Sequence, residues 1–276
     1  MPLKLMYITN DLAVAQIAEK AGVDRIWIDL EILGKEERQK GLNTVKSHHS
    51  VEDIKKIAPK LTSSEMMVRV NPWNDNSEAE LNQVITAGAQ IVMLPMWKNV
   101  TEVESFLQAV SGRCKTSLLL ETKEAVMCID KVLALNGIDE IHIGLNDLHL
   151  SYGMDFMFEL LADGTVEKLC KKIAATGIPY GFGGIAKIGE GILPADYIVT
   201  EHYRLGSTRV ILSRSFCNVE EISDNAEIEK LFSLNVRKLR EFEANLDKLT
   251  PIEFQDNLKK ICECVKLVVD KKRNNQ

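Results

Sequence analysis

Five charged side chains stand at or just beyond the ends of short apolar segments: Asp29, Glu31, Arg69, Glu121 and Asp147. An arginine within an apolar segment is rarely buried without a partner. Arg69 therefore either holds a substrate carboxylate or forms an internal ion pair with Asp29 or Glu31. The segment itself leaves both interpretations open.

Glu121 and Asp147 form the most informative pair of acids. Two neighbouring carboxylates repel each other unless a proton or a cation lies between them. A hard divalent ion, with water and substrate oxygens completing its shell, would satisfy both. Alternatively, either acid caps the helix that follows it or pairs with a lysine. Both interpretations stay open from the residues alone, with metal favoured for the pair.

The remaining proton-transfer and nucleophilic groups are fewer. His48 and His49 lie in a long connection after Glu31, and loop histidines are more often solvated than catalytic. No Ser-His-Asp order or nucleophile elbow occurs, which argues against an acyl-transfer hydrolase. A Schiff-base aldolase needs a desolvated lysine on a strand, whereas Lys98 and Lys187 stand in expected loops. A metal mechanism is favoured over an imine.

Eight apolar segments alternate with helical segments before residue 217. Most are near-continuous in Val, Ile, Leu and Met, as is typical of parallel strands buried on both faces. Eight such units favour a closed (β/α)8 TIM barrel, an α/β fold whose strand carboxyl ends bring the charged residues to one mouth. No glycine-rich nucleotide motif supports an open sheet. The strands are expected at Leu3–Ile8, Arg25–Leu30, Met66–Val70, Gln90–Leu94, Ser117–Leu120, Glu140–Leu145, Pro179–Gly183 and Arg209–Leu212.

Helix signals stand between these segments. Ser77 and Glu80 predict a capping box for a helix that ends at Gly88, and Thr122 predicts the start of another. After Phe216 the pattern changes to two long amphipathic helices. We expect residues 1–217 to form the barrel and residues 218–276 a C-terminal two-helix extension. Such helices cover either their own barrel or a neighbouring subunit, so we expect a homo-oligomer.

Composition narrows the class of protein. The 276 residues are 45% hydrophobic, which is enough for a sizeable core without disulfides or structural metal. A net charge of -6 argues against a nucleic-acid partner, and no apolar run is long enough for a membrane span. The six cysteines lack ligand spacing and the start lacks a signal pattern. We expect free thiols in a reducing cytoplasmic setting.

A series of motifs, in order, resembles the HpcH/HpaI aldolase and citrate lyase family. The similarity extends from about Leu3 to Phe216 and weakens after Gly153. Its strongest members are Ile28-Asp29-Leu30-Glu31, Val68-Arg69-Val70-Asn71, Leu120-Glu121-Thr122, Asn136-Gly137-Ile138-Asp139, Ile143-Gly144-Leu145-Asn146-Asp147-Leu148 and Ser151-Tyr152-Gly153.

The resemblance implies a class II-type aldolase. Such a lyase binds Mg²⁺ or Mn²⁺ with a small-molecule 2-oxo acid and makes or breaks a carbon–carbon bond through a pyruvate enolate. By position, Glu121 and Asp147 would be the metal ligands, and Arg69 would lie against the carbonyl and enolate oxygen. Asp29 and the amides around Asn146 and Asp147 would serve substrate binding.

One position departs from the family pattern. The aldolase branch has a histidine directly after the Asp-x-Glu of the second strand, and here that residue is Ile32. The resemblance implies that His48 or His49 takes its place from the loop, or Glu31 through a bound water. Asp29-Leu30-Glu31 also resembles the other branch, so an acyl-CoA lyase of the citrate lyase β or malyl-CoA type is an alternative. A barrel that keeps metal binding but has lost catalysis is a further one.

Overall fold

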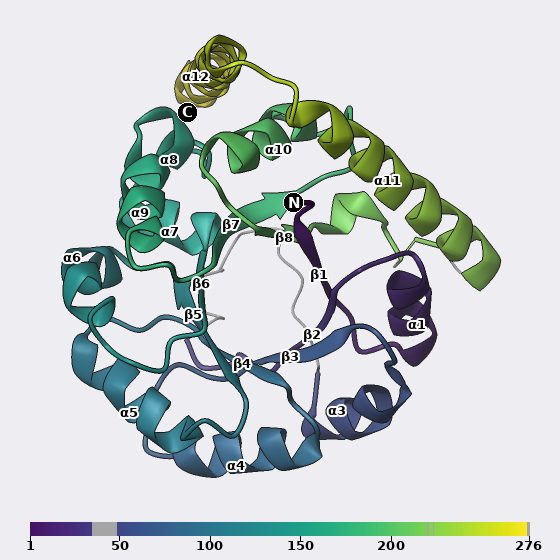
Figure 1. Cartoon of the computed structure of the whole chain (residues 1–276), viewed down its shortest axis with the longest axis vertical. Coiled ribbons are helices and arrows are strands. Elements are labelled where there is room, and N and C mark those ends of the chain that lie inside the picture. The colour runs from purple at the N-terminus through teal and green to yellow at the C-terminus, as the bar shows by residue number, and fades with distance from the viewer. Residues whose placement is uncertain (35–48, 220, 223, 275–276) are drawn as a thin grey trace.

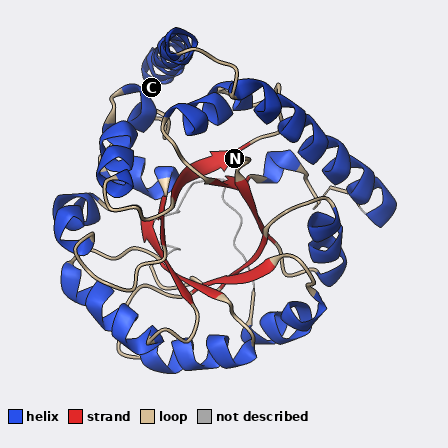
Figure 2. Cartoon of the chain, in the orientation of Figure 1, coloured by secondary structure: helices blue, strands red, loops and turns tan. Residues whose placement is uncertain are grey.

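The computed structural model describes residues 1–34, 49–219, 221–222 and 224–274. Eight parallel strands form a closed barrel in chain order, and helices surround it (Figures 1 and 2). The predicted TIM barrel is therefore confirmed. The strands are β1 (Lys4–Ile8), β2 (Arg25–Asp29), β3 (Glu65–Arg69), β4 (Ile91–Leu94), β5 (Lys115–Leu120), β6 (Glu140–Ile143), β7 (Tyr180–Ile185) and β8 (Arg209–Leu212).

The surrounding helices follow the strands in turn. They are α1 (Leu12–Lys20), α3 (Val51–Ile57), α4 (Ser77–Ala87), α5 (Val100–Val110), α6 (Lys123–Val132), α7 (Leu145–Ser151), α8 (Glu159–Ala162), α9 (Thr165–Ala174), α10 (Ala195–Arg204), α11 (Asn225–Leu246) and α12 (Pro251–Asn274). None of the described helices is long and apolar enough to cross a membrane.

Alternating side chains divide the hydrophobic interior into two clusters. One set of strand residues packs against the helices, as part of the large cluster that includes Ile26, Val68 and Leu118. The opposite set fills the inside of the barrel: Met6, Trp27, Met67, Ile91, Met93 and Leu119. Because each strand is buried on both faces, its sequence is near-continuously apolar.

Helix boundaries confirm some of the predicted caps and correct others. The Thr122 hydroxyl accepts the Ala125 amide at 3.1 Å and begins α6, and Gly88 ends α4 in the left-handed region at φ 117°. The predicted Ser77–Glu80 capping box is wrong. Ser77 is already the first helical residue, and Glu80 instead accepts hydrogen bonds from Asn71. A tertiary partner thus takes the carboxylate that a local cap would have used.

The two C-terminal helices occupy different places. Helix α11 contacts α1 and α10 and thereby closes the ring of helices, whereas α12 packs on α8 and α10 outside that ring (Figure 1). On α11, Glu243 accepts the Leu3 amide at 2.7 Å and Arg240 donates to the Leu3 carbonyl at 2.9 Å. The residue that leads into β1 is therefore held by α11. The division of the chain at residue 217 stays a prediction.

Buried charges fill the amino-terminal end of the barrel. The Arg25 guanidinium donates to both Glu140 oxygens, at 2.7 and 2.8 Å, and Arg209 donates to the same carboxylate. Burial raises the pKa of Glu140, and the two arginines more than offset this, so the pKa lies below its ordinary value. This end of a TIM barrel serves stability.

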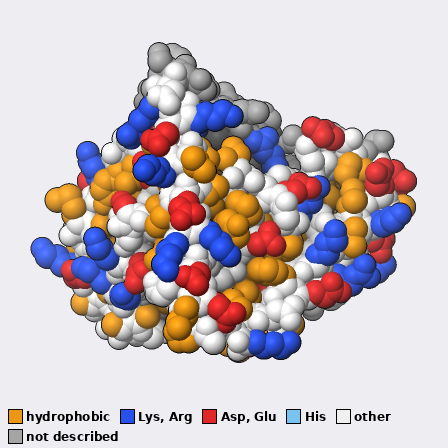
Figure 3. Space-filling model, turned by 90° about the horizontal axis from the view of Figure 1, so that it is seen from above, with side chains coloured by type: hydrophobic (Ala, Val, Ile, Leu, Met, Phe, Trp, Pro, Cys, Tyr) orange, Lys and Arg blue, Asp and Glu red, His pale blue; other side chains and the backbone are white. Residues whose placement is uncertain are grey.

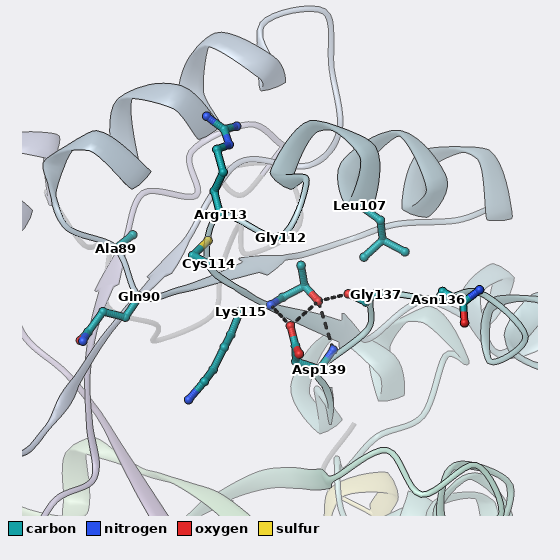
Figure 4. A pocket seen from close by; sticks show the side chains of 11 residues that line it. Ala89, Gln90, Leu107, Gly112, Arg113, Cys114, Lys115, Asn136, Gly137 and Asp139 are labelled. Carbon is teal, nitrogen blue, oxygen red and sulfur yellow. Dashed lines mark hydrogen bonds between the residues drawn. The ribbon is translucent and has the colours of Figure 1, made fainter.

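A cleft of about 570 Å³ also opens near the amino-terminal ends of β5 and β6 (Figure 4). Several polar groups that line the cleft form hydrogen bonds and ion pairs within the protein. Thr116 donates its hydroxyl to the Gly137 carbonyl at 2.5 Å, and the Asp139 carboxylate accepts the Thr116 amide at 2.8 Å. Lys115 pairs with Glu65 at 2.5 Å. We infer that these contacts stabilise the amino-terminal end of the barrel.

Candidate active site

Arg69 lies at the carboxyl end of β3, paired in register with Asp29 on β2. Its Nε and Nη2 donate to the two Asp29 oxygens, each at 2.8 Å, and its Nη1 lies 3.4 Å from a Glu31 oxygen. The guanidinium carbon also lies 5.3 Å from the centre of the Trp27 ring. The internal ion pair expected as one alternative is thus present, with both acids.

Electrostatics keep this arginine charged. Burial by itself lowers the pKa of Arg69, but the charges of Asp29 and then Glu31 outweigh it and raise the pKa above its ordinary value. The side chains of both acids are 2% exposed, whereas that of Arg69 is 13% exposed. The cation is the part of this cluster that retains access to the mouth. A guanidinium with five N–H donors can hold these acids and still donate to a substrate oxygen.

Glu121 follows β5 and is buried at the same end of the barrel. Its Oε1 accepts the amide of Met96 at 3.0 Å. Met96 has φ 54°, in the left-handed region that side chains other than glycine rarely adopt. Such strain collects where the surrounding structure fixes a functional group. The loop after β4 thus directs a main-chain donor at a buried carboxylate.

Gly144, after β6, lies against the other side of Glu121. A Cβ at this position would lie 2.8 Å from Glu121 Oε2 and 2.9 Å from Glu121 Cβ. These distances are shorter than real Cβ contacts, so only glycine leaves Glu121 in its place. The carboxylate is therefore confined between a donor amide and a bare Cα.

The Glu121–Asp147 pair fits a divalent cation. Burial, and then the charge of Asp147, raises the pKa of Glu121 well above its ordinary value, although Arg69 opposes this. A cation would relieve both effects. Within the described residues, no three or more His, Cys, Asp or Glu side chains form a metal-binding group. Two carboxylates suit Mg²⁺, which usually keeps several water ligands and binds through one or two protein carboxylates.

Sequence comparison agrees with this arrangement. Residues 5–160 match the family model for HpcH/HpaI aldolase/citrate lyase, which covers more than half of the chain. The chain belongs to the HpcH/HpaI aldolase/citrate lyase family. Its membership makes the chain a lyase-type enzyme, while the metal and substrate are taken up below. No curated protein sequence matches the chain.

Solved structures share the family fold. The HpcH/HpaI aldolase from Desulfitobacterium hafniense DCB-2 is 15% identical with a TM-score of 0.61, covering 87% of this chain and 93% of its own. Citrate synthase SbnG is 18% identical with a TM-score of 0.58, covering 87% and 94%. An HpcH/HpaI aldolase/citrate lyase family protein from Burkholderia cenocepacia J2315 is 13% identical with a TM-score of 0.56, covering 88% and 95%. At these identities the likeness concerns the fold.

The position that carries a histidine in the family's aldolase branch is directed away from the interior here. The Ile32 side chain is 65% exposed. The amides of Ile32 and Leu33 both donate to Asn71 Oδ1, at 2.9 and 3.0 Å, and Asn71 Nδ2 donates to Glu80 at 2.8 Å. Asn71 thus fixes the chain that leaves Glu31. It belongs to the motif of the third strand, but nothing in that motif revealed this role.

Of the two loop histidines, His49 is brought to the carboxyl end of β2. Its Nδ1 accepts the Asp29 amide at 2.9 Å. His48 lies outside the described residues. Asn146 and Asp147 are the second and third residues of α7, in the helix turn that follows Gly144. Their proposed roles in substrate and metal binding remain predictions of the family comparison.

Proposed function

We propose that this family member is a divalent-metal-dependent carbon–carbon lyase, a class II-type aldolase that acts on a 2-oxo acid through a pyruvate enolate. The observation that carries the proposal is the buried Glu121 carboxylate beside the partly buried Asp147, in an electrostatic environment that includes Arg69. Glu121 and Asp147 would hold Mg²⁺ or Mn²⁺, which supplies positive charge beside the substrate oxygen.

The protein's own groups have distinct tasks in this proposal. Arg69 donates to the carbonyl oxygen of pyruvate, where negative charge develops as the enolate forms. Asp29 fixes the orientation of the Arg69 guanidinium through its two hydrogen bonds. The amides of Asn146 and Asp147 bind the substrate carboxylate. Glu31 is the proton acceptor and acts through a bound water, because its own carboxylate is buried against Arg69. The C3–H bond breaks, the proton passes through this water to a Glu31 oxygen, and the bonding electron pair moves into the enolate.

Enolate formation can be measured without knowing the aldehyde partner. We expect pyruvate in D₂O to exchange its C3 protons when protein and Mg²⁺ or Mn²⁺ are both present, followed by proton NMR. Glu121→Ala should lower this rate at least about 100-fold, because the metal site loses one of its two carboxylates. Asp130→Ala is the matched control, since Asp130 is an exposed acid on α6 that pairs with Lys172. Its rate should equal that of the wild type.

The other outcomes separate the alternatives. A protein that binds Mn²⁺ but never exchanges pyruvate protons would contradict the aldolase proposal and favour the barrel that has lost catalysis. Exchange at the acyl methyl of acetyl-CoA, without exchange of pyruvate, would favour an acyl-CoA lyase. Equal rates for Glu121→Ala and wild type would remove Glu121 from the site.

We propose a cytoplasmic homo-oligomer with a small-molecule partner. On the face drawn in Figure 3, basic and acidic side chains are interspersed. That mixture, with the net charge of -6, supports the expectation that nucleic acid is not a partner. The six free cysteines fit a reducing compartment.

A further inference from the structure

The contact between His49 and Asp29 replaces a missing strand partner. The Leu30 amide donates to the main-chain carbonyl of Arg69 on β3. Successive amides of a strand point to opposite sides, so the preceding amide, that of Asp29, faces β1. Strand β1 ends at Ile8, and the chain turns at Asp11 into α1. The ring of His49 occupies this place, and its Nδ1 accepts the Asp29 amide at 2.9 Å.

This hydrogen bond fixes the tautomer of the ring. A ring nitrogen that accepts a hydrogen bond carries a lone pair, so the proton of neutral His49 is on Nε2. In that form Nε2 has no in-plane lone pair with which to take a proton from a substrate. Moving the proton to Nδ1 would set two N–H groups against each other. The geometry that binds Asp29 is incompatible with a base at Nε2.

We propose that His49 is a positioning residue for the Asp29–Arg69 pair and does not accept the substrate's proton; this inference rests on the proposed function. The imidazole holds the main chain of Asp29 where β2 ends. The carboxylate of Asp29 then binds Arg69 through two hydrogen bonds of 2.8 Å. The loop histidine thus leaves proton transfer to Glu31 and serves the orientation of the guanidinium.

Three substitutions separate positioning from proton transfer. The side-chain oxygen of His49→Asn reaches about as far as Nδ1, whereas the amide of His49→Gln reaches about as far as Nε2. We expect the pyruvate exchange rate of His49→Asn to lie within about threefold of wild type. His49→Gln and His49→Ala should lose about tenfold or more. Added imidazole should not restore His49→Ala. If the Asn variant is as slow as Ala, or imidazole restores activity, His49 is the base and the proposal is wrong.

A second measurement needs no activity. We expect the Asp29 amide proton to exchange with solvent at least fivefold faster in His49→Ala and His49→Gln than in wild type and His49→Asn. Hydrogen exchange followed by NMR gives these rates. Equal Asp29 rates in all four proteins would overturn the contact itself. A wild type without pyruvate exchange, but with the expected amide pattern, would contradict the proposed function and leave the positioning contact intact.

Discussion

At the scale of single residues, the position of Glu121 is set by main chain on both sides. The Met96 amide donates to one carboxylate oxygen, and the Cα of Gly144 lies against the side chain from the other direction. Neither neighbour contributes a charge. The orientation of the proposed metal ligand therefore depends on backbone conformation in two loops, one after β4 and one after β6.

Gly144→Ala should lower Mn²⁺ affinity by about 10–100-fold, because the added Cβ displaces the Glu121 carboxylate. Isothermal titration calorimetry with Mn²⁺ measures the effect. Gly184→Ala is the control, since its Cβ would meet only the main chain and Cβ of Ile211, the nearest atom at 3.3 Å. That variant should lose some stability and keep its Mn²⁺ affinity. Wild-type affinity in Gly144→Ala would show that this glycine does not position the ligand.

The sequence allowed the charged residues of the mouth to be predicted, because strand-end acids converge once a barrel is assumed. Met96 and Gly144 could not be found in this way. Their contribution comes from a main-chain amide and an absent Cβ, which residue types do not reveal. A methionine in the left-handed region gives no sequence signal at all. Asn71 and Glu80 were visible as polar residues, but their partners lie on different elements.

At the scale of elements, α4 helps to hold the connection that leaves β2. Burial raises the pKa of Glu80, and its hydrogen bonds with Asn71 partly offset that effect. Asn71 in turn accepts two amides from the chain after Glu31. A helix on the outside of the barrel is thus connected to the residues that border the mouth.

Asn71→Ala should release the amides of Ile32 and Leu33. We expect hydrogen exchange at both positions to become about fivefold faster or more, since a lost hydrogen bond is worth about 1 kcal/mol. The Leu30 amide donates to the main-chain carbonyl of Arg69, a contact that does not involve Asn71, and serves as the internal control. Asn71→Asp keeps an acceptor oxygen and should stay closer to wild type at both amides. Unchanged rates in Asn71→Ala would contradict the role of this side chain.

At the scale of the whole molecule, two histidines are buried as neutral groups. Burial lowers the pKa of His142 to about 4, and burial followed by the charge of His142 lowers that of His202. His142 Nε2 lies 3.0 Å from the Gly183 carbonyl, and the His202 ring stacks on Phe182 at 3.7 Å. Neither ring takes part in the proposed chemistry.

These rings should make the fold sensitive to acid. Below about pH 6.5 the imidazoles bind protons in the unfolded chain but stay neutral in the folded one. The free energy of unfolding therefore falls as the pH drops toward about 4. Each ring contributes up to about 1.4 kcal/mol per pH unit. The raised pKa of Glu121 acts in the opposite direction, so urea unfolding is best compared in a Glu121→Gln background. There, His142→Leu should reduce the slope between pH 6.5 and 4.5, and an unchanged slope would contradict the assignment.

The hydrogen bonds between Leu3 and α11 have a consequence for the order in which the chain folds. Strand β1 pairs with β8, and the Leu3 amide reaches a carboxylate 240 positions further along the chain. Contacts of such long sequence separation form late, because their loop entropy must be offset by structure already in place. During synthesis, the contact of Leu3 cannot form until residue 243 has left the ribosome. The β1–β8 pairing that closes the barrel also joins residues far apart in the chain, and until it forms the edges of these two strands depend on protection from aggregation.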